Sequence, residues 1–318
     1  MSEARLKLPN FGGLGASIGT VFTVLTGFWI LMMILLPVSY MVDFSFRFDL
    51  PPGKIGGPED VHTLDNYRYL LFGPPGSPER LSIFGWEFQA NVLHLVVFFR
   101  TILAAIFVTG LNFLICYPVT YFMAQKARGG TARLLAVCLI LPFWVNEILR
   151  AFAFRILLGG GGVVNEALIG MGLISEPIDF IRADVALYMG LTYAYILLMV
   201  FPLYNALESL DRNQIEAARD LGSPSWRIHW RVVMPHAKAG IASGCTMVFM
   251  LAVGALAVPQ ILGGPSNLWF TQVIYDRFNT SLNWPLGAAY AFVLLVTCVV
   301  FVLLVMRLFR VDLGEIAK

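Results

Sequence analysis

The chain has 318 residues, of which 58% are hydrophobic and only 13% are charged, and its net charge at pH 7 is +2. An ordinary soluble domain carries about 25% charged residues, so this composition argues against a soluble globular protein. The small net charge excludes the strong positive field that nucleic-acid binding requires. We therefore expect a membrane protein that has the lipid bilayer, and no nucleic acid, among its partners.

Six apolar stretches are long enough to cross a bilayer, which requires about 20 residues of helix. We therefore expect an all-α integral membrane protein with six transmembrane helices, in a single domain covering residues 1–318. The first stretch lacks a small-residue cleavage site, so we interpret it as a retained anchor. The expected spans are 18–42, 101–124, 134–157, 184–207, 239–262 and 285–307.

The distribution of Lys and Arg predicts the orientation of these spans. Basic residues are denser in 1–17, 125–133, 208–238 and 308–318 than in 43–100, 158–183 and 263–284. Cytoplasmic loops carry the excess of basic residues, so this bias predicts that both termini are cytoplasmic (N-in/C-in). It makes 43–100 a long periplasmic loop and places 208–238 inside the cell.

The cytoplasmic segment 208–238 contains an internally capped helix. Asp211 or Asn213 can cap its start, and it continues to Leu221. Gly222 stands where a C′ glycine would end it. The segment could be a solvated connector, but connectors between membrane helices are usually shorter and lack internal caps.

A second short helix is expected directly after this glycine. Ser223 can cap it, Pro224 suits its first position, and it runs from Trp226 to about Met234. Pro235 is expected to end it. Two short helices joined by a tight bend make a compact polar structure on one side of the membrane, which favours a docking site for a soluble partner.

This segment also carries a recognisable motif: E-A-A, three residues, G, nine residues, then an aliphatic residue, one further residue, an aliphatic residue and P. The matching residues are Glu216, Ala217, Ala218, Gly222, Val232, Met234 and Pro235. The motif resembles the ATPase-coupling loop of permease subunits of bacterial binding-protein-dependent ABC importers. Val and Met stand where Ile and Leu are more usual.

The resemblance extends along nearly the whole chain and is closest to the putrescine/spermidine-type subfamily. It implies a type I importer permease in the bacterial inner membrane, which pairs with a second permease subunit as a heterodimer. Two copies of a cytoplasmic ATPase subunit, which bind ATP and Mg, and a periplasmic solute-binding protein complete the assembly. The segments that carry the likeness are Thr63-Leu-Asp-Asn-Tyr67, Tyr117-Pro118, Leu141-Pro142, Asn165, Tyr193-Ala-Tyr195, Pro202-Leu-Tyr204, Pro259-Gln-Ile-Leu-Gly-Gly-Pro265 and Asn283-Trp-Pro285.

Ionisable residues inside a span are costly and usually have a purpose. Glu147 and Arg150 lie one helical turn apart, so they could simply pair, or Glu147 could face a polar cavity and help to pass a cationic solute. The resemblance supports a role for Arg150, because Arg is usual there in the subfamily, but it does not support one for Glu147.

Three further residues are candidates for the solute pathway. Gln260 follows Pro259 in a helix that proline and glycine can break, which is typical either of a cavity lining or of a helix end at the interface. Tyr188 and Tyr195 share a helix face, where they could bind a cation or only pack. Polyamine-specific relatives often carry an acidic residue at positions corresponding to 253–257, and this chain has none.

The sequence encodes no ATP site, because no G-x-x-x-x-G-K-[ST] motif occurs. It also contains no nucleophile with a nearby base and no metal-binding pattern of histidines or cysteines. We therefore expect no catalytic residue, metal or cofactor in this chain, and a partner ATPase must supply the energy. Putrescine or spermidine is the first solute candidate, and opine-like or aminophosphonate compounds are alternatives. An ion-gradient-driven transporter is a remote alternative, because it would predict internal repeats that are not found.

Overall fold

The computed structural model describes residues 12–54, 56–74, 80–83, 86–89, 91–127, 129–264 and 267–311. Nearly all of these residues are helical, which confirms the all-α prediction. The one strand pair among them is an antiparallel hairpin of β1 (Arg80–Ile83) and β2 (Trp86–Gln89).

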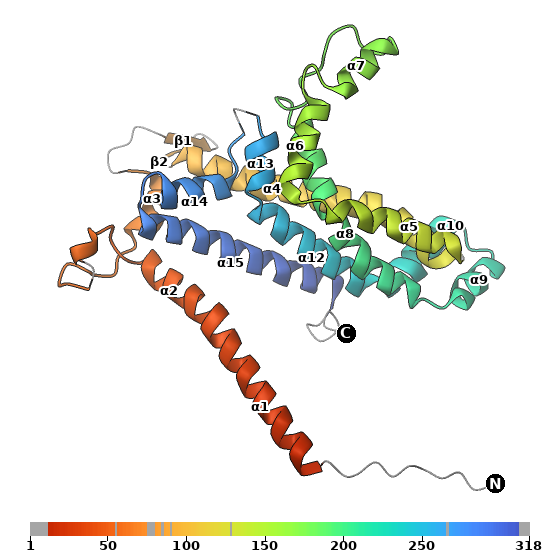
Figure 1. Ribbon diagram of the computed structural model, residues 1–318, viewed down its shortest axis with the longest axis horizontal. Helices are drawn as coiled ribbons and strands as arrows, with labels where there is room; N and C mark the ends of the chain where they lie inside the picture. Colours follow the sequence, from red (N-terminus) through yellow and green to blue (C-terminus); the bar gives the residue numbers. More distant parts are fainter. Residues whose placement is uncertain are drawn as a thin grey trace.

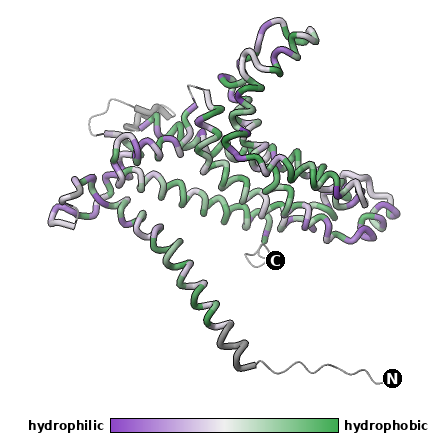
Figure 2. The backbone as a smooth tube through the Cα atoms, in the orientation of Figure 1, coloured by the Kyte–Doolittle hydropathy of each residue, from purple (hydrophilic) through white to green (hydrophobic). Residues whose placement is uncertain are grey.

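Five helices are long and apolar enough to cross a membrane, and a sixth span is obtained if one bent helix pair is counted. The pair consists of Ser225–His236 and Lys238–Gly254, which meet at 74°. The apolar residues follow the long helices, and the polar residues gather at their ends (Figure 2). The spans are formed by α1 (Gly12–Ile30), η1 (Leu31–Leu35) and α2 (Leu36–Ser45); α4 (Val92–Tyr121) and η3 (Phe122–Lys126); α6 (Glu147–Leu158) and α7 (Val163–Gly170); α8 (Val185–Glu208); α12 (Lys238–Gly254); and α15 (Trp284–Phe309).

Helices α4, α8 and α12 form the centre of the bundle (Figure 1). Small residues let α8 and α12 approach closely, as is typical of helix pairs in membranes. A Cβ atom on Gly240 would collide with the carbonyl oxygen of Pro202, and one on Gly244 would lie 2.7 Å from the sulfur of Met199. Leu203 on α8 and Phe249 on α12 are fully buried in this core.

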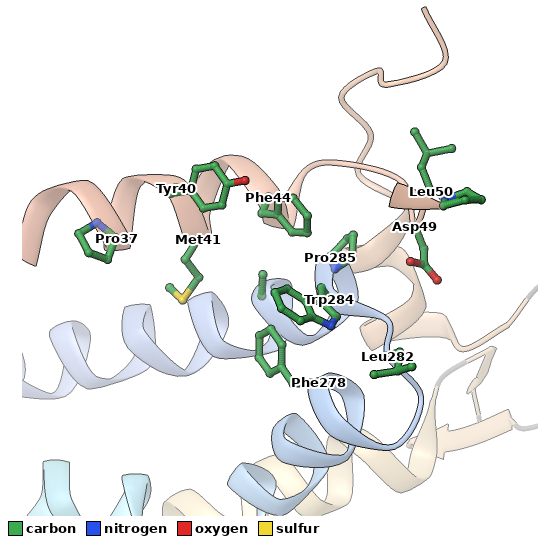
Figure 3. A pocket seen from close by; sticks show the side chains of 12 residues that line it. Pro37, Tyr40, Met41, Phe44, Asp49, Leu50, Phe278, Leu282, Trp284 and Pro285 are labelled. Atoms are coloured by element: carbon green, nitrogen blue, oxygen red, sulfur yellow. The ribbon is translucent and has the colours of Figure 1, made fainter. Parts of the chain in front are cut away.

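Helices α1 and α2 form one long helix that leaves the bundle (Figure 1). Residues 19–40 of this helix are all exposed. Within the described residues, this long helix packs at its C-terminal end, where α2 lies against α15. An apolar pocket of about 910 Å³ lies at this junction, with Met41 and Phe44 of α2 facing Trp284 of α15 (Figure 3).

The expected third span, 134–157, is not one continuous helix. It is divided into α5 (Gly130–Ile140), a 3-10 turn η4 (Leu141–Trp144) and α6. Pro142 in the turn has no N–H to donate, and the side chain of Asn146 caps the restarted helix by accepting from Ile148 N at 2.9 Å. The break places Glu147 at a helix start and not in mid-span.

The expected fifth span, 239–262, is also interrupted. Helix α12 ends at Gly254, Ala255 is extended, and α13 (Ala257–Leu262) packs against α6. Helix α4 begins at Val92, so residues 92–100 of the expected periplasmic loop are helical. The remaining helices are η2 (Pro52–Lys54), α3 (Asp65–Phe72), α9 (Arg212–Asp220), α10 (Ser225–Ile228), η5 (His229–Val233), α11 (Met234–His236) and α14 (Phe270–Asn279).

Candidate functional site

The candidate coupling site is the segment that joins α8 to α12, which we name the coupling segment (residues 208–238). Its first helix is α9, and Asp211 caps it by accepting from Asn213 N at 3.0 Å. Of the two candidate caps, the structure therefore selects Asp211. Ile215 is buried against the bundle, whereas Glu216 and Ala217 are exposed and Ala218 is half-buried. One face of α9 thus holds the helix in place, and the other remains open.

Gly222 ends α9 as the sequence predicted. Its φ is +76°, the left-handed region that favours glycine. Gly222 N donates to Arg219 O at 2.9 Å, and Ser223 N donates to Ala218 O at 3.1 Å. These two bonds make a Schellman motif, which satisfies carbonyl groups at the helix end and fixes the direction of the bend.

The second helix differs from the expectation in two respects. Pro224, and not Ser223, is its N-cap, and α10 begins at Ser225. Pro235 does not end it, because the helix continues through a π-helical turn, His229–Val233, into α11. The wider turn before the proline accommodates a residue that cannot donate its own N–H. The chain instead bends at Ala237, where the 74° change of direction into α12 occurs.

The outward face of the coupling segment carries large apolar side chains. Leu221, at the tip of the bend, is 86% exposed, and Trp226 is 63% exposed with the Arg227 guanidinium 5.5 Å from its ring. Sequence reasoning missed Leu221 as a candidate. The sequence feature that could have indicated Leu221 is its position, because it is an apolar residue at the C-cap of a helix whose exposed face is otherwise polar.

The structure brings together three of the candidate pathway residues. The hydroxyl of Tyr195 on α8 donates to a carboxylate oxygen of Glu147 at 3.3 Å. Arg150 lies on the same helix as Glu147, but no ion pair between them is formed. The guanidinium carbon of Arg150 lies instead 5.6 Å from the ring centroid of Phe143 and 5.8 Å from that of Tyr193.

The other two candidates lie apart from this group. Tyr188 stacks edge-on with Phe107 at 5.2 Å and lines a shallow apolar hollow on α4. Tyr188 and Tyr195 therefore do not form one cation-binding surface. Gln260 lies on α13, and its side chain is exposed. In the same region Arg155 of α6 donates to the carbonyl oxygen of Ile261, so α6 brings a second arginine close to α13.

Comparison with known proteins agrees with the motif. The family described as the binding-protein-dependent transport system inner membrane component matches residues 117–310. The spermidine/putrescine transport system permease protein PotB of Escherichia coli (strain K12) is 31% identical over 284 residues, 89% of this chain and 94% of that protein. PotB of Haemophilus influenzae is 38% identical over 184 residues, 57% of this chain and 64% of that protein. The inner membrane ABC transporter permease protein YdcU of E. coli is 27% identical over 267 residues, 80% of this chain and 82% of that protein.

Solved structures share the fold at low sequence identity. A chain of a bacterial alginate ABC transporter, in complex with an alginate pentasaccharide-bound periplasmic protein, superposes with a TM-score of 0.67 at 16% identity, covering 96% of this chain and 99% of that one. A chain of the MetNI methionine ABC transporter in an inward-facing conformation gives 0.51 at 18% identity, covering 68% and 94%. The chain therefore belongs to the family of inner membrane components of binding-protein-dependent transport systems, and it is a multi-pass protein of the inner membrane.

Proposed function

We propose that this chain is the translocation subunit of an ATP-driven importer, with both termini in the cytoplasm, and that its coupling segment receives the ATPase. The observation that carries the proposal is the capped bend at Gly222, which presents Leu221 and Trp226 to the outside while Ile215 stays buried. Exposed large apolar side chains on an ordered surface are typical of a protein–protein interface. Glu216, Ala217, Ala218 and Pro235 lie on the same segment, and the first two are exposed beside the bend.

The partners follow from the family. We infer a heterodimer with a second permease subunit, two copies of a cytoplasmic ATPase that binds ATP and Mg, and a periplasmic protein that delivers the solute. The chain itself then catalyses no reaction. ATP-driven closure of the ATPase pair would move the two coupling segments together and switch the membrane cavity between its outward-facing and inward-facing forms.

The solute that the relatives indicate first is putrescine or spermidine, because the PotB relatives carry that name. Glu147 would then help to pass the cation, with Tyr195 holding its carboxylate in position. A second candidate is a compound that carries both an amine and an acid group, such as an opine-like or aminophosphonate solute. The observation that favours it is that α6 presents two arginines, Arg150 and Arg155, for the single carboxylate of Glu147.

The test is uptake by the complete transporter in proteoliposomes, with the periplasmic protein outside the vesicles and ATP inside. We expect uptake of labelled spermidine that requires ATP and the periplasmic protein, and we expect unlabelled putrescine to compete. Competition by an amino acid derivative and none by putrescine would favour the second candidate. Uptake that proceeds without ATP and collapses with an ionophore would refute the ATPase-coupled function.

A further inference from the structure

The coupling segment is tied to a helix that is far away in sequence. Nδ1 of His229, in the π-helical turn η5, lies 2.7 Å from the hydroxyl of Tyr117 on α4. The His229 ring also packs edge-on against Tyr121, with the centroids 4.5 Å apart. These contacts join residues separated by more than a hundred positions, so they depend on tertiary packing and do not follow from chain connectivity.

The position of these contacts on α4 is informative because Pro118 lies between the two tyrosines. A proline inside a helix removes one backbone hydrogen bond and leaves a weak point. A second set of hydrogen bonds joins the inner end of α4 to the end of α8 and the start of the coupling segment. There the buried side-chain amide of Gln125 donates to the carbonyl oxygens of Leu207 and Leu210. The missing bond is the one to the carbonyl oxygen of Leu114, so Tyr117 lies within the weakened turn, whereas the Gln125 bonds lie on its inner side.

Helix α4 is also held at its outer end. Thr101 accepts from Phe270 N at 3.0 Å, and His94 is hydrogen-bonded to Tyr290 at 2.7 Å. With its π-helical end, α4 spans 35 residues, which corresponds to a rod about 50 Å long. Phe270 follows the loop after α13. Helix α4 therefore connects the coupling segment, through His229, to the start of α14, which follows the broken fifth span.

We propose that His229 is the joint that delivers movement of the coupling segment to the turn of α4 that Pro118 weakens, and from there to the outer end of the bundle. His229 is a positioning residue in this role, because it contacts neither solute nor nucleotide. The inference rests on the proposed function, since a joint has a purpose only if the coupling segment is driven. Without the joint, α4 would still follow α8 and α12, against which it packs, but among the described residues the coupling segment would hydrogen-bond to it only near its inner end, as at Gln125.

The experiment uses the complete transporter in proteoliposomes and measures solute imported per ATP hydrolysed. Tyr117→Phe removes only the hydroxyl, and His229→Phe removes the hydrogen bond but keeps a ring against Tyr121. We expect each to lower the ratio about fivefold, which is what the loss of one ordinary hydrogen bond gives in an equilibrium. The double variant should be no worse than either single variant, because both remove the same bond. His229→Asn, which keeps a polar atom near the Nδ1 position, should restore most of the ratio.

The matched control is Tyr67→Phe, which removes a hydroxyl that is hydrogen-bonded to Ser45 at 2.6 Å, outside the coupling segment. It should transport with the normal ratio. A normal ratio in Tyr117→Phe would overturn the joint, and this variant alone decides the result if His229→Phe does not assemble. If Gly222→Val is uncoupled in the same preparation, the proposed function stands although the joint fails. If neither variant changes the ratio and uptake does not need ATP, the proposed function itself fails.

Discussion

Replacing Gly222 with valine tests whether the bend of the coupling segment has to keep its shape. The φ of +76° at this position is disfavoured for any residue with a Cβ, and most of all for a β-branched one. An added Cβ atom would meet no other atom within 4 Å, so the variant introduces backbone strain without a clash. Strain of this kind costs about 2 kcal/mol, which shifts the equilibrium between native and relaxed bends about 30-fold.

We expect Gly222→Val to insert and to bind its ATPase partner more weakly, and to import less solute per ATP hydrolysed. The assay is uptake and phosphate release measured in the same proteoliposomes. Gly222→Asn is the matched control, because asparagine tolerates the left-handed region, and it should lose little. Gly172→Val adds similar strain at a φ of +70° in equally open surroundings, but outside the coupling segment, and its uptake per ATP should stay normal. Normal coupling in Gly222→Val would refute the reasoning that the bend geometry matters.

Three further substitutions address the docking surface, the solute pathway and the protrusion between α6 and α8. Leu221→Asp should reduce the amount of ATPase that co-purifies with the permease by at least about tenfold, because it places a charge at the exposed tip of the interface; unchanged recovery would place the interface elsewhere. Glu147→Gln should raise the KM for spermidine at unchanged protein level, since the amide can still accept from Tyr195 but has no charge; an unchanged KM would leave Glu147 a structural residue. Asn165→Ala should make the segment after α6 sensitive to protease, because the buried amide bonds Gly159 O, Ile178 O and Ile178 N, and losing these bonds costs about 1–3 kcal/mol; wild-type resistance would contradict that role.

The parts of the coupling segment that the sequence predicted correctly depend on neighbouring residues only. A cap at Asp211 and a left-handed glycine at Gly222 are decided within one turn of helix, so a local pattern suffices. The π-helical turn before Pro235 was not predictable in this way, because a proline can either end a helix or be accommodated by a wider turn, and the burial of Val233 against the bundle favours the continued helix. The contact of His229 with Tyr117 depends on how α4 lies beside the segment, and no spacing in the sequence reports that.

The same distinction between local and long-range causes applies to the candidate pathway residues. Glu147 and Arg150 are one turn apart, so an ion pair between them is geometrically possible. Whether it forms depends on the partners that other parts of the chain offer to each side chain. Aromatic rings from η4 and α8 flank the guanidinium of Arg150, and Tyr195 donates to Glu147. The break before α6 was likewise hidden in an apolar stretch, although Pro142 and Asn146 were its local signals.

Three buried side chains explain why backbone strain at position 222 should change the shape of the bend and should not detach the coupling segment from the bundle. Ile215, Ile228 and Val233 are buried against the bundle, and exposing them would cost about 1.5–3 kcal/mol each. That sum exceeds the strain of about 2 kcal/mol from a valine at position 222. The segment therefore stays docked while its tip is displaced. The same buried residues should keep the segment attached when a partner displaces its exposed tip. The displacement would then be transmitted to α8, to α12 and, through His229, to α4.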